Sequence, residues 1–337
     1  MNWQNQLKGD PFPWLLEDAE PGPRYLALRY LLDTPSNSPE LIDAKKKAHT
    51  DGPIAAILNK MHPEGYWEKP GPGYSPKYRS NVWSLILLAQ LGAGLEMDNR
   101  IEKAVNYYLE NAFSPDGRIS HSSSPSGTID CLQGNMCTAL LDLGCRDERL
   151  EKAFEWMARS LTGEGVGPQS DKQAEIRYSA HKCGPLFACS ANDKKSCAWG
   201  AAKVMLAFGK LPKEKRTPLI ERAIRQGIDF LFSVNPAQAL WPSPYASKPS
   251  GDWWKFGFPV FYITDLLQVT EALVLLGYGH DERLADSLDL IRSKQDQHGC
   301  WQLEFDYTGK TWVNFGPKKQ PNKWVTLRAL RVLKGVG

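Results

Sequence analysis

The sequence predicts an all-α protein, an α/α toroid of about six inner and about five or six outer helices. Three observations predict it. A helix-ending glycine, a capping aspartate and a new helix recur along the 337 residues. The helices before these glycines are apolar nearly all round, as in a buried helix, whereas the helices after them bury a single stripe. No alternating run is long enough to predict a sheet.

The recurring turn is read from three segments. Residues 143–150 have the sequence LGCRDERL, residues 276–284 have LGYGHDERL, and Leu91-Gly92 leads to DNRI at 98–101. In each, glycine is suited to end one helix and aspartate to cap the next. Each place therefore predicts a helical hairpin.

Extending this alternation places every expected helix. Residues 82–88, VWSLILL, are apolar on all sides. Apolar side chains in the helix after residue 98 recur at i, i+3, i+4 and i+7 instead. We expect inner helices near 24–33, 81–92, 132–144, 198–209, 262–277 and 323–334. Outer helices are expected near 38–60, 98–112, 148–161, 216–233 and 281–293.

The amino-terminal segment 1–22 is expected to supply the missing outer partner and close the ring. The whole chain, 1–337, would then be a single domain. An open solenoid is the alternative, but it would need polar caps at its ends. The last expected helix is instead followed almost at once by the end of the sequence.

Composition narrows the class of protein. An apolar content of 42% and a net charge of +3, without a run of five or six like charges, indicate a soluble globular chain and argue against nucleic acid as a partner. Charges and prolines interrupt the first 25 residues, and no stretch of about 18 apolar residues follows. The expectation is a cytoplasmic protein without a transmembrane segment. Seven cysteines favour thiols or metal ligands over a disulfide framework.

One link after an outer helix carries a recognisable motif. Gln295, Gly299 and Trp301 fit the pattern Q-x3-G-x-W, and weaker copies lie at 61–67 and 115–119. The motif resembles the repeat of the prenyltransferase and squalene-cyclase superfamily, especially bacterial members with no assigned reaction. The resemblance implies an α/α barrel in which Gln295 and Trp301 serve turn and packing roles.

In that superfamily the ends of the inner helices line a cavity. Here aromatic residues lie near those ends, and we take them as candidates for binding an apolar substrate such as an isoprenoid. Ordinary core packing is the alternative for each. The candidates are Trp83, Trp199, Trp253, Trp254 and Tyr262.

Two aspartates are candidate acids. Asp130 and Cys131 resemble the Asp-Cys pair of oxidosqualene cyclases, in which the aspartate protonates the substrate. The family's threonine does not follow the pair here, and no D-x-D-D motif occurs in the sequence. Asp265 also begins an expected inner helix. Either residue can instead be a simple helix cap.

Cysteines support a competing interpretation. Cys183, Cys189 and Cys197 follow one another closely after His181, and Cys131 begins the preceding inner helix. Parallel inner helices would bring these thiols to the same rim, where they suit a zinc site or an iron-sulfur cluster. Their spacing is not that of a zinc knuckle. The D-x-C zinc motif of protein prenyltransferase β-subunits is not matched, because Asp130 and Cys131 are adjacent.

Two functions remain open. The first is a terpene or prenyl cyclase-like protein that holds an apolar molecule in an aromatic cavity. If it is catalytic, it would be a lyase or isomerase whose reaction is initiated by an acid. The second is a non-catalytic or metal-organised toroid that binds a lipid, a glycan or a protein. The sequence does not decide between them, and it leaves the substrate and the oligomeric state open.

Overall fold

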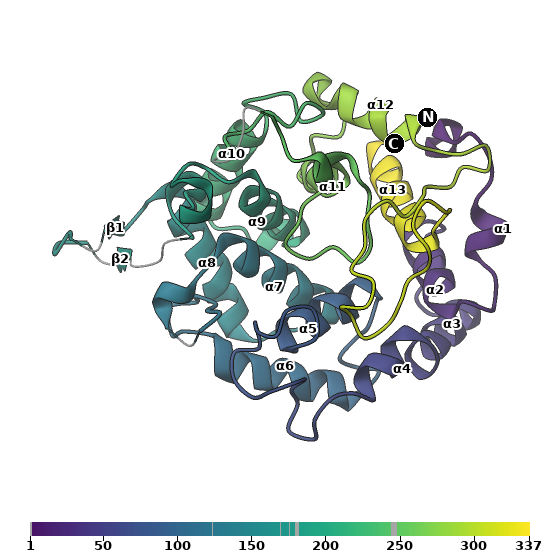
Figure 1. Ribbon diagram of the computed structural model, residues 1–337, viewed down its shortest axis with the longest axis horizontal. Helices are drawn as coiled ribbons and strands as arrows, with labels where there is room; N and C mark the ends of the chain where they lie inside the picture. The colour runs from purple at the N-terminus through teal and green to yellow at the C-terminus, as the bar shows by residue number, and fades with distance from the viewer. Residues whose placement is uncertain (1, 123, 169, 175, 179–181, 244–247) are drawn as a thin grey trace.

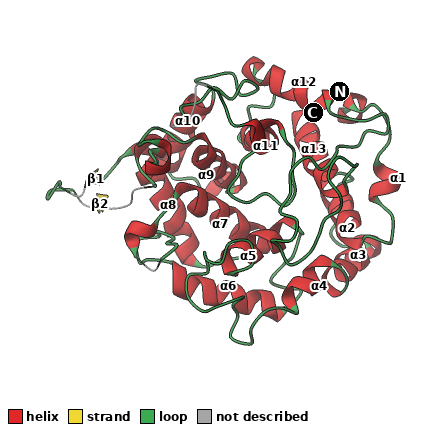
Figure 2. Ribbon diagram, in the orientation of Figure 1, coloured by secondary structure: helices red, strands yellow, loops and turns green. Residues whose placement is uncertain are grey.

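Helices make up nearly all the regular structure of this protein (Figure 2). The computed structural model describes every residue except 1, 123, 169, 175, 179–181 and 244–247. Within the described part, the named strands are β1 (Val166–Pro168) and β2 (Ile176–Tyr178), which pair in parallel. The prediction of an all-α protein is therefore confirmed. No described helix is long and apolar enough to span a membrane.

The inner helices are buried on most sides. Each overlaps a range expected from the sequence, although α11 begins four residues later because Asp265 caps it. They are α2 (Pro21–Tyr30), α5 (Asn81–Gln90), α7 (Asp130–Leu143), α9 (Ala198–Lys210), α11 (Leu266–Leu275) and α13 (Lys323–Val336).

Neighbouring inner helices pack on one another in chain order from α5 to α13, and α13 packs on α2 (Figure 1). The end of α5 meets α2 as well. A Cβ atom added to Gly92 would lie 2.7 Å from Cδ2 of Leu26. The first, second and last inner helices are thus neighbours in space.

The outer helices lie on the periphery (Figure 1). Each buries one stripe, as the periodicity predicts. The expected helix 38–60 is divided in two, because Gly52 has a φ of +87° that a continuous helix does not accommodate. The outer helices are α3 (Pro39–Thr50), α4 (Pro53–Leu58), α6 (Asn99–Ala112), α8 (Glu148–Thr162), α10 (Pro218–Leu231) and α12 (Ala285–Ser293).

The remaining helices are short. Helix α1 (Phe12–Leu15) precedes α2. The described 3-10 helices are Trp3–Gln6, Pro125–Gly127, Pro185–Phe187, Ser190–Asn192, Lys213–Lys215, Gly251–Trp254 and Glu282–Leu284.

The recurring turn has the same geometry in all three copies. Its glycines adopt positive φ angles, which end the preceding inner helix. Each aspartate then accepts a hydrogen bond from the backbone N–H two residues ahead, and the arginine side chain at that position binds the same carboxylate. The glycines are Gly92, Gly144 and Gly277, and the capping pairs are Asp98–Arg100, Asp147–Arg149 and Asp281–Arg283.

The turn from Gln295 to Trp301 anchors the amino-terminal segment. The Gln295 side chain accepts from the backbone N–H of Lys8 (3.0 Å) and donates to the carbonyl of Gln6 (3.0 Å). Trp301 is buried, and its indole N–H donates to the carbonyl of Ile291 (2.8 Å). The Gln6 side chain also donates to the Leu333 carbonyl in α13 (3.1 Å). These contacts place the amino-terminal segment against the last inner helix.

Candidate functional site

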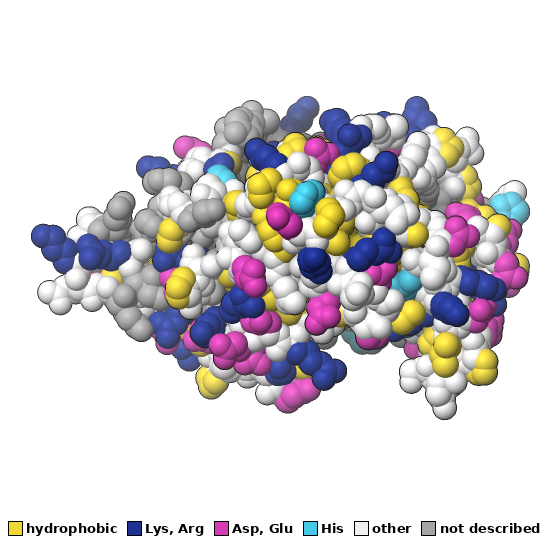
Figure 3. Space-filling view, turned by 90° about the horizontal axis from the view of Figure 1, so that it is seen from below, with side chains coloured by type: hydrophobic (Ala, Val, Ile, Leu, Met, Phe, Trp, Pro, Cys, Tyr) yellow, Lys and Arg dark blue, Asp and Glu magenta, His cyan; other side chains and the backbone are white. Residues whose placement is uncertain are grey.

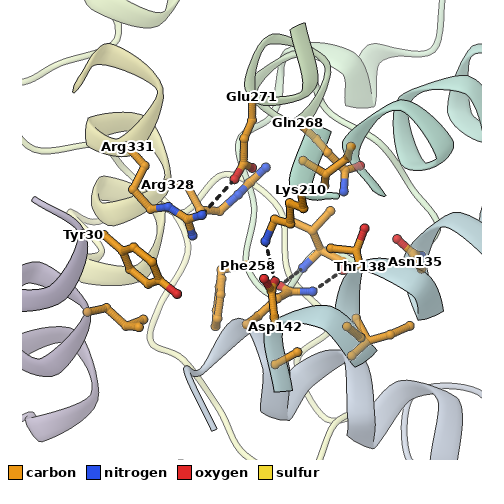
Figure 4. A pocket seen from close by; sticks show the side chains of 17 residues that line it. Tyr30, Asn135, Thr138, Asp142, Lys210, Phe258, Gln268, Glu271, Arg328 and Arg331 are labelled. Carbon is orange, nitrogen blue, oxygen red and sulfur yellow. Dashed lines mark hydrogen bonds and ion pairs between the residues drawn. The ribbon is translucent and has the colours of Figure 1, made fainter. Parts of the chain in front are cut away.

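A cavity lies among the inner helices, and all of them contribute to its wall (Figure 4). Its volume is about 80 Å³, counted as space open to the centre of a water molecule. A single water needs roughly 10–15 Å³ by that measure, so the space suits several waters or a small polar group. It is lined by Leu26, Tyr30, Ile86, Ala89, Gln90, Asn135, Thr138, Ala139, Asp142, Leu206, Lys210, Phe258, Val260, Gln268, Glu271, Arg328 and Arg331. We call this space the central cavity.

Paired charges dominate the polar wall of the central cavity (Figure 4). Lys210 from α9 forms an ion pair with Asp142 from α7. Arg331 from α13 lies 3.3 Å from a carboxylate oxygen of Glu271 in α11. Such pairing keeps charges tolerable in a partly buried site. The wall therefore offers both donors and acceptors to a polar ligand.

One polar group of this wall has no partner. The Thr138 hydroxyl is buried and makes no hydrogen bond with any residue that the structure describes. Most buried polar side-chain atoms have a partner, so an unsatisfied one needs an explanation. A ligand or an ordered water in the central cavity would supply one.

A smaller aromatic pocket lies beside the central cavity. The two share Ile86 and Asn135 as wall residues. The aromatic pocket holds only about 10 Å³ of space, about as much as a single water needs. It is lined by Tyr74, Val82, Trp83, Ile86, Ile129, Cys131, Leu132, Asn135 and Tyr262.

Four of the five aromatic candidates form one cluster by this pocket. The ring centroid of Tyr262 lies 6.3 Å from that of Trp83 and 6.2 Å from that of Trp199. Trp199 in turn lies 6.5 Å from Trp253. Trp254 lies outside this cluster, and its indole N–H donates a hydrogen bond to the carbonyl of Ala237 (2.8 Å). None of these five lines the central cavity.

Asp130 is the first residue of α7 and not its cap, which is Ile129. Burial raises the pKa of its carboxyl to about 8, although hydrogen bonds from Cys183 and the Gly184 backbone oppose the shift. One carboxyl oxygen has no hydrogen-bond partner among the described residues. Cys183 also contacts the Ser160 hydroxyl (3.1 Å). Burial thus favours the protonated form of Asp130, but this residue does not line the central cavity.

Asp265 has a different environment. It is the N-cap of α11 and accepts from the backbone N–H of Gln268 (2.8 Å) and of Gly257 (3.3 Å). The guanidinium of Arg328 binds both carboxylate oxygens, each at 2.8 Å. Asp265 is therefore a helix cap fixed by a bidentate ion pair.

The candidate metal ligands divide into two groups. Cys183 binds Asp130, whereas the thiol of Cys197 hydrogen-bonds with those of Cys131 and Cys189. Among the described residues, no group of three or more histidine, cysteine, aspartate or glutamate side chains is arranged to hold a metal ion. His181 lies outside the described residues. No disulfide joins any of the seven cysteines in the part of the chain that the structure describes.

The charged residues of the central cavity were not found from the sequence. The available signal was a charge inside a helix that is otherwise apolar, as Asp142 is in α7 and Glu271 is in α11. Lys203 shows the same signal in α9. It is fully buried, contacts Thr264, and burial lowers its pKa to about 8.

The face in Figure 3 carries charges of both signs. On the face in Figure 3, lysine and arginine side chains alternate with aspartate and glutamate over the described residues. Among the inner helices, charged side chains line the central cavity.

No protein-family model matches the chain, and no curated protein matches it. Solved structures similar to it include the type II terpene cyclase MstE from Scytonema in complex with merosterolic acid A as product. That match has 12% identity, 88% of this chain and 97% of that chain covered, and a TM-score of 0.36. A complex of the same cyclase with geranylgeranyl dihydroxybenzoate as substrate has 12% identity, coverages of 88% and 97%, and a TM-score of 0.32. A protein from Actinoplanes has 11% identity, coverages of 87% and 99%, and a TM-score of 0.32.

Proposed function

We propose that the chain is a closed α/α toroid that binds a small amphiphilic molecule among its inner helices. The polar end of the ligand lies in the central cavity, and its apolar, isoprenoid-like chain extends toward the aromatic pocket. The observation that carries this proposal is the wall that the charged cavity and the aromatic pocket share, formed by Ile86 and Asn135. Contacts of α13 with α2 support the closed ring.

The charges of the central cavity limit the polar end of the ligand. Three cations and two carboxylates line it, and Arg328 is already paired with Asp265, which lies outside the lining. The balance therefore leaves no excess positive charge for a diphosphate. A hydroxyl group or a single carboxylate fits better, since it can exchange hydrogen bonds with Thr138 and Arg331.

The apolar part of the ligand is accommodated by rearrangement. The aromatic pocket has too little space for a chain as the side chains now stand. Ile86 and Asn135 line both spaces, so a rearrangement that joins the two spaces involves these side chains. Aromatic faces of Trp83 and Tyr262 would then pack against the chain.

Farnesoic acid and farnesol test the proposal as probes, with binding followed by tryptophan fluorescence and calorimetry. We expect both to bind the wild type. Arg331→Met should lower the affinity for farnesoic acid about tenfold or more, because one charge-assisted hydrogen bond is lost. Ile86→Trp should weaken both probes by filling the shared wall. Arg222→Met, at an exposed ion pair with Glu164, is the control and should change neither affinity.

Failure of both probes to bind the wild type would contradict the proposal. Equal binding by wild type, Arg331→Met and Ile86→Trp would also contradict it, because the probes would then bind elsewhere. Acetate serves as a tail-free comparison. If acetate displaced farnesoic acid at equal concentration, the apolar chain would contribute nothing and the amphiphile would be the wrong class of ligand.

A second candidate is acid-initiated cyclisation of an apolar substrate by Asp130. One observation favours it: this carboxyl is buried and has a pKa of about 8, so at neutral pH it carries the proton that such a reaction needs. The reaction would transfer this proton to an alkene or epoxide, and aromatic faces would stabilise the resulting cation.

Squalene and 2,3-oxidosqualene are the probes for this second candidate, with products analysed by mass spectrometry. Turnover should persist in the presence of a chelator and disappear in Asp130→Asn. Asp265→Asn is a poor test by itself, because the loss of its ion pair destabilises α11. Absence of a cyclic product from the wild type would reject the candidate and leave the binding proposal untouched.

A further inference from the structure

Three cysteines meet where two inner helices begin. Cys131 is the second residue of α7, Cys197 is the N-cap of α9, and Cys189 lies in the loop between the helices. The thiol of Cys197 hydrogen-bonds with both of the others. Cys131 and Cys197 are partly exposed, whereas Cys189 is buried. Cys131 also lines the aromatic pocket.

Glycines allow the two helices to approach closely at this point. A Cβ atom added to Gly134 in α7 would lie 2.4 Å from the carbonyl carbon of Lys203 in α9. One added to Gly200 would lie 3.0 Å from Cβ of Asp130. Since both helix starts are fixed by this contact, Cys131 and Cys197 are held together by backbone packing.

The loop before α9 is fixed as well. The Cys197 N–H donates to the carbonyl of Phe187 (2.9 Å), and the Cys189 N–H donates to that of Lys195 (3.2 Å). Ala188 and Ser196 form an antiparallel bridge between these bonds. The thiols therefore belong to a small, hydrogen-bonded unit.

The surroundings favour a thiolate on Cys131. Its side chain lies in the first turn of α7, where the helix dipole stabilises negative charge. The hydrogen bond from Cys197 and the positive charge of Lys203 both lower the pKa of Cys131, although burial opposes them. The hydrogen bond to Cys131 raises the pKa of Cys197 to about 12. The pair thus consists of a more acidic thiol and a thiol that donates to it.

We propose that Cys131 and Cys197 form a redox-active dithiol that reacts with a low-molecular-weight disulfide. The Cys131 thiolate attacks one sulfur of the disulfide, forms a mixed disulfide, and releases the other sulfur as a thiolate. Cys197 loses its proton to that thiolate and attacks the Cys131 sulfur, which breaks the mixed disulfide and releases its small half as a second thiolate that takes a proton from the solvent. The products are a Cys131–Cys197 disulfide and two small thiols, so the protein is oxidised by two electrons and the small disulfide is reduced. This inference does not depend on the proposed ligand.

The experiment uses 2-hydroxyethyl disulfide as the probe and the full-length protein at pH 7, with peptide mass spectrometry as the readout. The wild type should form the Cys131–Cys197 disulfide. Cys197→Ser should accumulate the mixed disulfide on Cys131, because no resolving thiol remains. Cys131→Ser should lose the reaction at Cys197. In the wild type, Cys131 should react roughly tenfold faster than Cys145 or Cys300, which are buried.

Cys137→Ser is the matched control, since Cys137 lies in the same helix but is buried away from the pair. It should react as the wild type does, and thermal unfolding should show that all variants fold. Three outcomes would overturn the proposal. They are a Cys131 reaction no faster than that of Cys300, a Cys189–Cys197 disulfide in the wild type, and stoichiometric bound zinc that both Cys131→Ser and Cys197→Ser lose.

Discussion

The starts of α7 and α11 carry two aspartates that look equivalent in the sequence but differ in the structure. Asp265 at α11 is bound by the guanidinium of Arg328 and by two backbone N–H groups. Asp130 at α7 has no cation in contact among the described residues, and burial raises its pKa to about 8. Local sequence places an acid at a helix start, but a residue distant in the chain decides whether that acid has an ion-pair partner.

The difference assigns the two aspartates different roles. A carboxylate held by an arginine on both oxygens stabilises structure, because the ion pair fixes its position. A buried carboxyl without a cation retains its proton near neutral pH. Arg328 also lines the central cavity, so the ion pair at α11 connects the helix start to the proposed ligand site.

Removal of Arg328 should have the largest effect. Its side chain is 11% exposed and that of Asp265 is 6% exposed, so Arg328→Met leaves a buried carboxylate unpaired. We expect a loss of about 3–5 kcal/mol in the free energy of unfolding, measured by urea denaturation. The control is Arg222→Met, whose side chain is 44% exposed and whose pair should contribute less than about 1 kcal/mol. If both variants lost the same free energy of unfolding, the buried ion pair at α11 would contribute no more to stability than an exposed one.

Asp130→Asn should change how stability depends on pH. The ordinary pKa of an aspartate carboxyl is 3.8, and burial raises the pKa of Asp130 in the folded protein to about 8. Between these values the folded state binds the extra proton, so rising pH destabilises the wild type, by about 3 kcal/mol from pH 5 to pH 8. Asp130→Asn should remove this slope and be more stable than the wild type at pH 8.

The control for this prediction is Asp289→Asn, at a side chain that is 74% exposed. It should keep the wild-type slope. Burial lowers the pKa of Lys203 from 10.5 to about 8, so Lys203 begins to titrate only at the upper end of this window, and it does so in the wild type and in Asp130→Asn alike. If wild type and Asp130→Asn had parallel stability curves from pH 5 to pH 8, Asp130 would be ionised throughout.

The helices could be predicted because their signals are local. Apolar residues on every side marked α5, and the Leu-Gly turn followed by an aspartate marked the junction of α7 and α8. The predicted helix 38–60 was wrong in being continuous. The glycine at position 52 indicated a possible break in the helix, but the apolar stripe continues past it into α4.

The candidate site was less predictable because its chemistry depends on pairs from distant segments. Asp142 meets Lys210, and Glu271 meets Arg331, across 60 or more residues. The sequence did gather Cys131, Cys189 and Cys197 at one rim, but it did not distinguish contact between thiols from coordination of a metal. Likewise, the sequence identified the aromatic residues but did not predict how their rings pack.

Gly134→Ala should test the close approach of α7 and α9. The added methyl would meet backbone atoms of Lys203 and Val204 at 2.4–2.6 Å, so the helices must move apart. We expect a loss of roughly 2 kcal/mol, measured by urea denaturation. The comparison is Gly144→Ala, where the added atom meets nothing within 4 Å and only the φ of +91° is strained. If Gly134→Ala lost no more stability than Gly144→Ala, α9 would be able to move away from α7 at little cost in free energy.

Asp147→Asn should have the smallest effect and the opposite dependence on pH from Asp130→Asn. Asp147 caps α8, and the hydrogen bond from Arg149 is the main cause that lowers its pKa from 3.8 to about 2. Stability from this carboxylate is complete above the unfolded pKa and is lost as pH falls through the folded value. Asparagine can still cap the helix, so only the charge is removed, and we expect a loss of about 1 kcal/mol at pH 7.

This difference between wild type and Asp147→Asn should shrink as the pH approaches 2, as measured by thermal unfolding. Asp281→Asn is the matched variant, because Asp281 forms the same cap with Arg283, whose side chain is more exposed at 52% than that of Arg149 at 35%. Its loss should be smaller. If the loss of stability in Asp147→Asn stayed constant down to pH 2, the charge would not be its cause. The loss would then come from a helix cap that asparagine does not replace. Opposite slopes for Asp130 and Asp147, which lie on consecutive helices, would establish that the presence of an arginine partner sets the protonation of each acid.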